Sequence, residues 1–118
     1  MTFLRRGEVY LVEFDPDRGH EIRNTRPALV IQNDVGNRYS RVIIVAVITS
    51  RLSPIPYPVE VVVESNKGNG LSVRSAIHLD QIRSVDRERL VKRLGALDVP
   101  AMRKVDDAVR ISLGLVEI

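Results

Sequence analysis

The fold is decided by one stretch of the sequence, VIIVAVIT at residues 42–49. From Val42 to Ile48 every position is apolar, so an extended chain would be apolar on both faces, as in a strand at the centre of a sheet. The run is far too short to cross a bilayer, which takes about 20 residues of helix. It therefore predicts the central strand of a folded core.

Shorter strand-like segments lie on both sides of this stretch, separated by turn-rich pieces such as DPDRG and SNKGNG; they cover residues 8–14, 28–32, 59–63 and 75–82. In the last of them, alternation places Ile77 and Leu79 inward and His78 and Asp80 outward. Five strands with no helix between them predict an antiparallel sheet that curls into a small barrel.

Helices are predicted only near the end of the chain. Residues 87–94 form the first, capped by Ser84 or Asp86 and ended by Gly95. The second opens at Asp98 and Pro100 and runs to about Leu115. Its core-facing side is predicted to carry Met102, Val105, Val109 and Ser112. Residues 51–58, which hold three prolines, are predicted to be an irregular loop.

Length and composition predict one domain over residues 1–118, with 44% hydrophobic residues for its core. The absence of cysteine excludes disulfides, thiolate metal sites and a catalytic thiol. The first residues lack the apolar stretch of a signal peptide, so we expect the cytoplasm and no membrane association.

Positive charge is concentrated in one part of the chain. The net charge is only +3, yet residues 18–51 hold six arginines against Glu21 and Asp34. This excess indicates a polyanion as partner, with nucleic acid the commonest. The preference for arginine over lysine suits bidentate phosphate binding, although a GC-rich genome would produce it too.

Arg26 stands out within this region, in the stretch NTRPALVIQND at residues 24–34. Pro27 stiffens the backbone just where a long loop enters a strand, which favours a well-placed anion site. The alternative is an ordinary surface arginine paired with Glu21 or Asp34. No paired-histidine metal motif, phosphate-binding glycine loop or G-x-S-x-G elbow occurs.

Several ordered motifs resemble the MazF/PemK toxin endoribonucleases of bacterial toxin–antitoxin pairs. They are RRGEVYLVEFDPDRGHE, TRPALVIQND, VAVITS, LDQIRSVD and MRKVDDAVRISLGL, and together they run over nearly the whole chain. The resemblance implies an SH3-like barrel followed by helices, a homodimer, and a cognate antitoxin with an acidic, disordered tail. It also implies sequence-specific cleavage of single-stranded RNA without a metal or other cofactor, leaving 2′,3′-cyclic phosphate and 5′-hydroxyl ends.

The resemblance assigns the catalytic roles to Arg26 and Thr49. The RNA-contacting positions that it implies are Glu21, Asn33, Ser50, Arg51, Ser75 and Gln81. Two other functions remain open: a non-catalytic toxin of the same fold that binds a protein such as gyrase, and a plain RNA-binding barrel.

Two histidines depart from the pattern of many relatives, which carry serine in place of His20 and an aliphatic residue in place of His78. Arginine stays protonated at ordinary pH and is a poor general base, so the group that removes the 2′-hydroxyl proton is missing from the implied set. His20 is one candidate for that role. Each histidine also has a simpler interpretation as a surface or packing residue.

Overall fold

The computed structural model describes residues 3–14, 25–55 and 57–117. Its strands form an antiparallel sheet in the order β4-β5-β3-β2-β1-β6. Their bounds are Glu8–Glu13 for β1, Thr25–Val30 for β2, Val42–Thr49 for β3, Glu60–Val63 for β4, Ser75–Asp86 for β5 and Leu90–Ala96 for β6. Helix α1 spans Asp34–Tyr39, the 3-10 turn η1 spans Arg87–Arg89, and α2 spans Val99–Ser112. The predicted fold class, a mostly β fold with an SH3-like antiparallel sheet and a C-terminal helical part, is confirmed; the sheet is not closed into a barrel among the described residues, and one long helix, α2, follows it.

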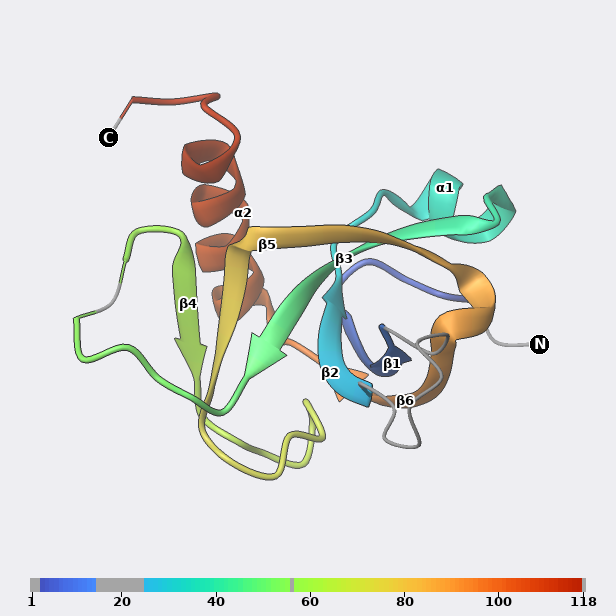
Figure 1. Cartoon of the computed structure of the whole chain (residues 1–118), viewed down its shortest axis with the longest axis horizontal. Helices are drawn as coiled ribbons and strands as arrows, with labels where there is room; N and C mark the ends of the chain where they lie inside the picture. Colours follow the sequence, from blue (N-terminus) through green and yellow to red (C-terminus); the bar gives the residue numbers. More distant parts are fainter. Residues whose placement is uncertain (1–2, 15–24, 56, 118) are drawn as a thin grey trace.

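The sheet bends at an irregularity in β5, the long strand that changes direction beside α2 in Figure 1. Ala46 of β3 pairs with Ile82, but the next residue, Val47, pairs with His78, so residues 79–81 of β5 have no partner in β3. Such a bulge increases the local bend and twist. β4 and β6 are the two edges of the sheet, and the loop after β4 reaches across to β6, where the Ala96 amide donates to the Gly68 carbonyl at 2.9 Å.

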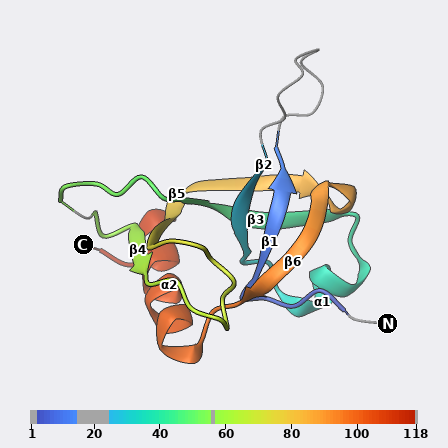
Figure 2. The ribbon, with the colours of Figure 1, turned by 90° about the horizontal axis from the view of Figure 1, so that it is seen from below.

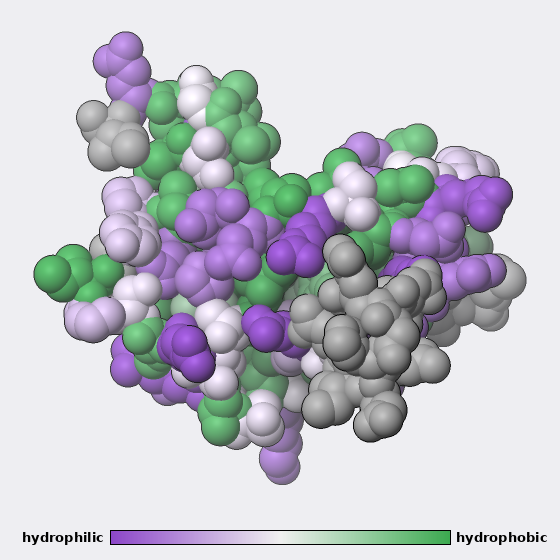
Figure 3. Space-filling model, viewed as in Figure 1, coloured by the Kyte–Doolittle hydropathy of each residue, from purple (hydrophilic) through white to green (hydrophobic). Residues whose placement is uncertain are grey.

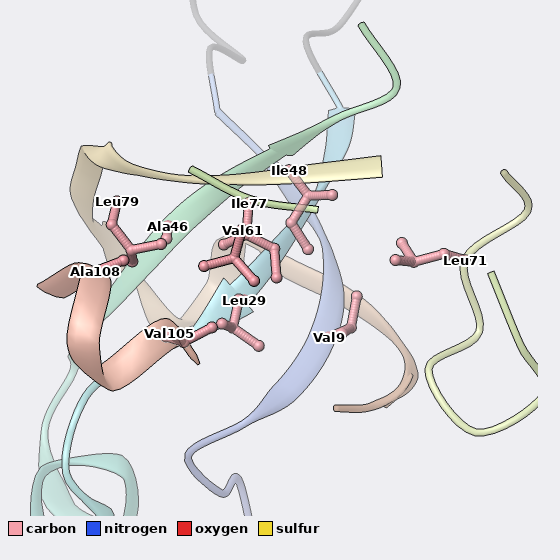
Figure 4. Close-up of a cluster of buried hydrophobic side chains, with 10 residues drawn as sticks. All are labelled: Val9, Leu29, Ala46, Ile48, Val61, Leu71, Ile77, Leu79, Val105 and Ala108. Carbon is pink, nitrogen blue, oxygen red and sulfur yellow. The ribbon is translucent and has the colours of Figure 1, made fainter. Parts of the chain in front are cut away.

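β3 lies between β5 and β2, as its continuous apolar sequence predicts. Alternate residues of β3 serve two hydrophobic clusters: Ala46 and Ile48 belong to one, and Ile43 and Val45 to the other. Each face of the central strand therefore packs against a core of its own. Figure 4 shows the first cluster, in which side chains of the sheet meet Val105 and Ala108 of α2.

α2 packs on β4 and β5 through the predicted face. Val105 and Ala108 are buried, Met102 and Val109 are partly buried against the core, and the Ser112 hydroxyl donates to the Leu79 carbonyl at 2.5 Å. The helix begins at the predicted cap, where the Asp98 carboxylate accepts from the Ala101 amide, and it ends at Ser112 rather than near Leu115. α1 and α2 lie at opposite ends of the sheet (Figure 2).

The helix predicted over residues 87–94 is wrong. Asp86 does cap a turn, but the turn is only η1, and the chain then enters β6. β6 pairs with β1, with Tyr10 opposite Arg93 and Val9 opposite Gly95, so its backbone is bonded to a strand that is remote in sequence. Pairing of this kind overrides helix propensity.

α1 was missed between β2 and β3, because six residues containing a glycine show no helical periodicity. Two strands are also longer than predicted: β2 begins at Thr25 and β5 continues to Asp86. Pro27 is tolerated in β2 because pairing with β3 begins only at Ala28. The described part of residues 51–58 contains no strand or helix, as predicted.

Candidate active site

An open cleft of about 710 Å³ lies where β2 begins and β3 ends. Its walls come from the start of β2, the end of β3, the loop that follows β3, and the bend of β5. The residues that line it are Arg26, Pro27, Val47, Ile48, Thr49, Ser50, Arg51, Leu52, Ser53, Pro54, His78 and Gln81. Five of the sequence-predicted site residues, Arg26, Thr49, Ser50, Arg51 and Gln81, thus meet in one place.

Arg26 and Thr49 come together through strand register. Ala28 of β2 lies opposite Val47 of β3. Arg26 and Thr49 each lie two residues beyond this pair, where β2 begins and β3 ends. Residues two apart in a strand point to the same face. Both residues line the cleft, so a guanidinium and a hydroxyl from neighbouring strands are presented to whatever enters it.

Thr49 also shapes the exit from β3. Its Oγ1 accepts a hydrogen bond of 3.1 Å from the Arg51 amide. This local bond fixes the turn through Ser50 and Arg51, both of which are exposed. It uses a lone pair of the hydroxyl, so the hydroxyl hydrogen is left to donate to an anion in the cleft.

Gln81 reaches the cleft because of the bulge in β5. It belongs to the segment 79–81 that has no partner in β3, and it is exposed. Bulges redirect side chains beside functional sites. Two hydrogen bonds hold the bulge in place. The Leu79 amide donates to the Val59 carbonyl, and the Leu79 carbonyl accepts from the Ser112 hydroxyl.

His78 lies in the same cleft. Its Nδ1 is 3.5 Å from an Asp80 carboxylate oxygen and 3.9 Å from a Glu60 carboxylate oxygen. Glu60 is buried, and its carboxylate accepts from the Ser53 hydroxyl at 3.0 Å. The pairing of Glu60 with His78 across β4 and β5 holds this contact in place.

The cationic side chains that line the cleft are those of Arg26 and Arg51. They suit an anionic ligand, with guanidinium forks that match phosphate geometry. Among residues 3–14, 25–55 and 57–117, no three histidine or acidic side chains come close enough to hold a metal ion.

Comparison with known proteins identifies the family. Residues 5–113 match the family described as PemK-like, MazF-like toxin of type II toxin–antitoxin systems. The chain belongs to this family. It is 44% identical over 112 residues to an endoribonuclease MazF from Staphylococcus saprophyticus, covering 95% of this chain and 92% of that protein.

Solved structures of the family share the fold. The MazF of a MazE–MazF complex from Deinococcus radiodurans matches with a TM-score of 0.80 and 26% identity, over 98% of this chain and 100% of that one. An endoribonuclease from a mycobacterial species matches with a TM-score of 0.77 at 22% identity, over 100% of this chain and 98% of that one. The curled sheet of this PemK/MazF-like protein is therefore the fold of the family.

Two of the residues that the resemblance implied lie away from the cleft in this PemK/MazF-like chain. Ser75 is buried, donates to the Val73 carbonyl at 2.9 Å, and lines a neighbouring groove of about 400 Å³ that also touches Thr49 and Ser50. Asn33 follows the opposite end of β2, where its side chain accepts from the Gly36 amide and caps α1. An RNA contact at either residue stays a prediction.

The acid next to Asn33 also has partners of its own at that end. The Asp34 carboxylate accepts from the Arg6 amide and from the Asn37 side chain, and the Arg6 bond in particular lowers the pKa of Asp34. Glu21 and His20, the remaining predicted residues of this MazF-like chain, lie outside the described residues.

Proposed function

We propose that this protein is an endoribonuclease toxin of the cytoplasm that cleaves single-stranded RNA at short sequences without a metal ion. The observation that carries the proposal is that Arg26, at the start of β2, and Thr49, at the end of β3, line one open cleft. The 44% identity to an endoribonuclease MazF supports the same class of activity.

The chemistry follows from what these two groups offer. When the 2′-hydroxyl of RNA attacks the adjacent phosphorus, negative charge rises on the non-bridging oxygens. The Arg26 guanidinium offers charged hydrogen-bond donors to those oxygens, and the Thr49 hydroxyl offers a neutral one. The products are a 2′,3′-cyclic phosphate and a 5′-hydroxyl.

The residues around Arg26 and Thr49 select the RNA sequence. Ser50, Arg51 and Gln81 line the same cleft and present hydroxyl, guanidinium and amide groups to bases and backbone. Groups of these types read the edges of unpaired bases. On the family resemblance we assign Asn33 and Ser75 to more distant parts of the RNA path, and Glu21 to a contact with RNA.

The test is incubation of purified protein with a long single-stranded RNA in excess chelator. We expect discrete fragments that carry 2′,3′-cyclic phosphate and 5′-hydroxyl ends, identified by mass spectrometry. RNA that is bound but left intact would favour a plain RNA-binding barrel. RNA that is neither bound nor cut would favour a toxin that acts on a protein.

An antitoxin is the second proposed partner. The related MazF of Deinococcus radiodurans occurs in a complex with MazE. An acidic, disordered antitoxin segment would compete with RNA for Arg26 and Arg51, since both ligands present negative charge to the same groups. We expect a saturating acidic antitoxin peptide to abolish RNA binding, and unchanged RNA affinity would contradict this competition.

A further inference from the structure

Among the described residues, the imidazole that lines the cleft is that of His78, and two acids lie beside it. Glu60 on β4 and Asp80 on β5 both approach its Nδ1, at 3.9 and 3.5 Å. These distances are longer than a full hydrogen bond, but two carboxylates on one side of the ring favour a proton on that nitrogen. The other ring nitrogen, Nε2, is then unprotonated in the neutral imidazole and able to accept a proton.

Burial of the Glu60 carboxylate is costly in folding stability. Its side chain is 1% exposed, and its carboxylate accepts from two neutral donors, the Ser53 hydroxyl and the Tyr57 amide. A buried carboxylate needs a nearby positive charge or loses much stability. Among the described residues, the basic group within 4 Å of Glu60 is His78. The Glu60 carboxylate therefore lies beside the group that becomes positively charged when a base takes a proton.

Strand register brings His78 to the proposed catalytic pair. Val47 of β3 lies opposite His78, and Thr49, two residues further along β3, lies opposite Ala76. His78 and Thr49 are thus diagonal neighbours on one face of the sheet, a separation of about 7–8 Å that suits groups on either side of one phosphate. His78 is 12% exposed and lines the same cleft as Arg26.

We propose that His78 is the general base of RNA cleavage and that Glu60 positions it, an inference that rests on the proposed function. The 2′-oxygen forms a bond to phosphorus as the bond from phosphorus to the 5′-oxygen breaks. The proton of the 2′-hydroxyl passes to Nε2, and the departing 5′-oxygen takes a proton from water. The imidazolium, stabilised by Glu60 and Asp80, then returns its proton to solvent.

The base must be neutral to act, so the cleavage rate should fall as the pH drops through the range where histidines titrate, about pH 5 to 8. The described groups that face His78 have opposing effects on this fall. Glu60 and Asp80 favour the charged imidazole, whereas Arg26 and Arg51, in the same cleft, oppose it.

The experiment compares wild-type protein with His78→Asn and His78→Ala in single-turnover cleavage between pH 5 and 9. Each variant should cleave about 100- to 10,000-fold more slowly at pH 8, the usual contribution of a general base, and should lose the fall in rate at low pH. Added imidazole should raise the rate of His78→Ala and not that of wild type. Binding to a 2′-deoxy oligonucleotide should stay within error. Both variants should lower the thermal midpoint, because the buried Glu60 carboxylate loses its basic neighbour. Rates are therefore measured at a temperature where circular dichroism shows each variant to be folded, which separates chemistry from folding.

Glu60→Gln provides the test of positioning. It keeps the shape of the side chain but removes the charge, so the imidazolium is less stabilised, and the fall in rate should move to lower pH while the rate above pH 8 drops. If Glu60→Gln lowered only the thermal midpoint and left the pH profile in place, its role would be structural and the positioning claim would be overturned.

The outcomes separate this proposal from the proposed function. A wild-type protein that leaves RNA intact in chelator overturns both. A wild-type protein that cleaves while His78→Asn cleaves equally fast, with the same pH profile, overturns the assignment of His78 alone. A substrate with sulfur in place of the 5′-bridging oxygen needs no proton on its leaving group. If this substrate restored the rate of His78→Asn, His78 would be the general acid instead.

Discussion

The sharpest test of the cleft is a pair of substitutions at Arg26. Arg26→Lys keeps the positive charge but loses the planar fork of donors, and Arg26→Ala removes both. If the guanidinium contacts the phosphate oxygens in the transition state, both variants should slow the chemical step. The two variants thus separate directed contact from general attraction.

The expected magnitudes differ strongly between binding and chemistry. Arg26 is exposed, so its ion pair with a bound phosphate should contribute no more than about 1 kcal/mol, or roughly fivefold in RNA affinity. A donor aimed at the developing charge is worth about 2.7–4 kcal/mol, or roughly 100- to 1000-fold in rate. Because surface substitutions change the free energy of unfolding by only about 0.5 kcal/mol, misfolding should not obscure this difference.

The assay is single-turnover cleavage of a short oligonucleotide, with affinity measured separately on a 2′-deoxy analogue that cannot react. Arg110→Ala is the matched control, because Arg110 is also exposed but lies on α2, paired with Asp107. It should cleave at the wild-type rate. The reasoning is refuted if Arg26→Lys cleaves as fast as wild type, or if both Arg26 variants weaken binding and spare the chemical step.

The other predictions concern Thr49, the loop against β6, the N-terminal segment and assembly. Thr49→Val should slow cleavage less than Arg26→Ala, since a neutral hydroxyl makes a weaker hydrogen bond than a guanidinium; an equal or larger loss in single-turnover rate would contradict this ranking. Gly95→Ala should destabilise the fold by about 1–3 kcal/mol in urea unfolding, because the new Cβ would lie 2.2 Å from the Gly68 carbonyl oxygen. Gly68→Ala, whose Cβ meets only a side-chain atom at 3.3 Å, should cost about 0.5 kcal/mol or less, and equal losses in the two variants would refute the argument. The pKa of Asp34 is lowered mainly by its bond from the Arg6 amide, so the carboxylate stabilises the fold above its unfolded pKa of about 3.9 and loses this effect as the pH falls through its folded value. Asp34→Asn should therefore be less stable than wild type by about 1 kcal/mol at pH 7 and equally stable at the acid end of the titration, whereas a difference that does not depend on pH would contradict the charge-based account. Finally, large apolar side chains are exposed over residues 113–116, at the end of α2 (Figure 3), and we expect sedimentation at twice the monomer mass of 13.3 kDa; a single species of monomer mass at micromolar concentration would exclude the dimer.

The sequence predicted the strands best where one physical cause controls each residue. β3 is apolar at nearly every position because each of its faces packs against a separate cluster, and the alternation in β5 matches the burial of Ile77 and Leu79. These are local consequences of burial, and they can be read from spacing alone. The same holds for the Asp98 cap of α2, where the residue type required at a helix start is itself a local signal.

The prediction failed where a distant partner decides the structure. Residues 90–96 have the charges and leucines of a surface helix, yet β1 needs a second neighbour, and pairing with it converts the segment into β6. Gly95 illustrates the cause. It was interpreted as the end of a helix, but in the sheet it allows the backbone at Gly68 to approach closely, a role that only the tertiary structure reveals.

In the candidate site, too, the sequence indicated some residues, but their arrangement depends on strand pairing. The stiffened backbone before Pro27 singled out Arg26 from the sequence, and the family resemblance added Thr49, but only the pairing of β2 with β3 brings the two residues to one cleft. The bulge that brings Gln81 into the cleft depends on the pairing of β3 with β5, and no turn residue in the sequence marks it.

The contact between Glu60 and His78 depends on the fold even more. The alternation of the sequence correctly predicted that His78 points away from the first hydrophobic cluster. The outward direction of a side chain does not show which residue it contacts. Its partner is an acid at the start of β4, in the stretch EVVV, and nothing in the sequence pairs that acid with His78. Pairing of β4 with β5 buries that acid against the imidazole. Burial of the Glu60 carboxylate beside the cleft lowers stability, and the proposed role of His78, a base that carries a positive charge at each turnover, gives that burial a function.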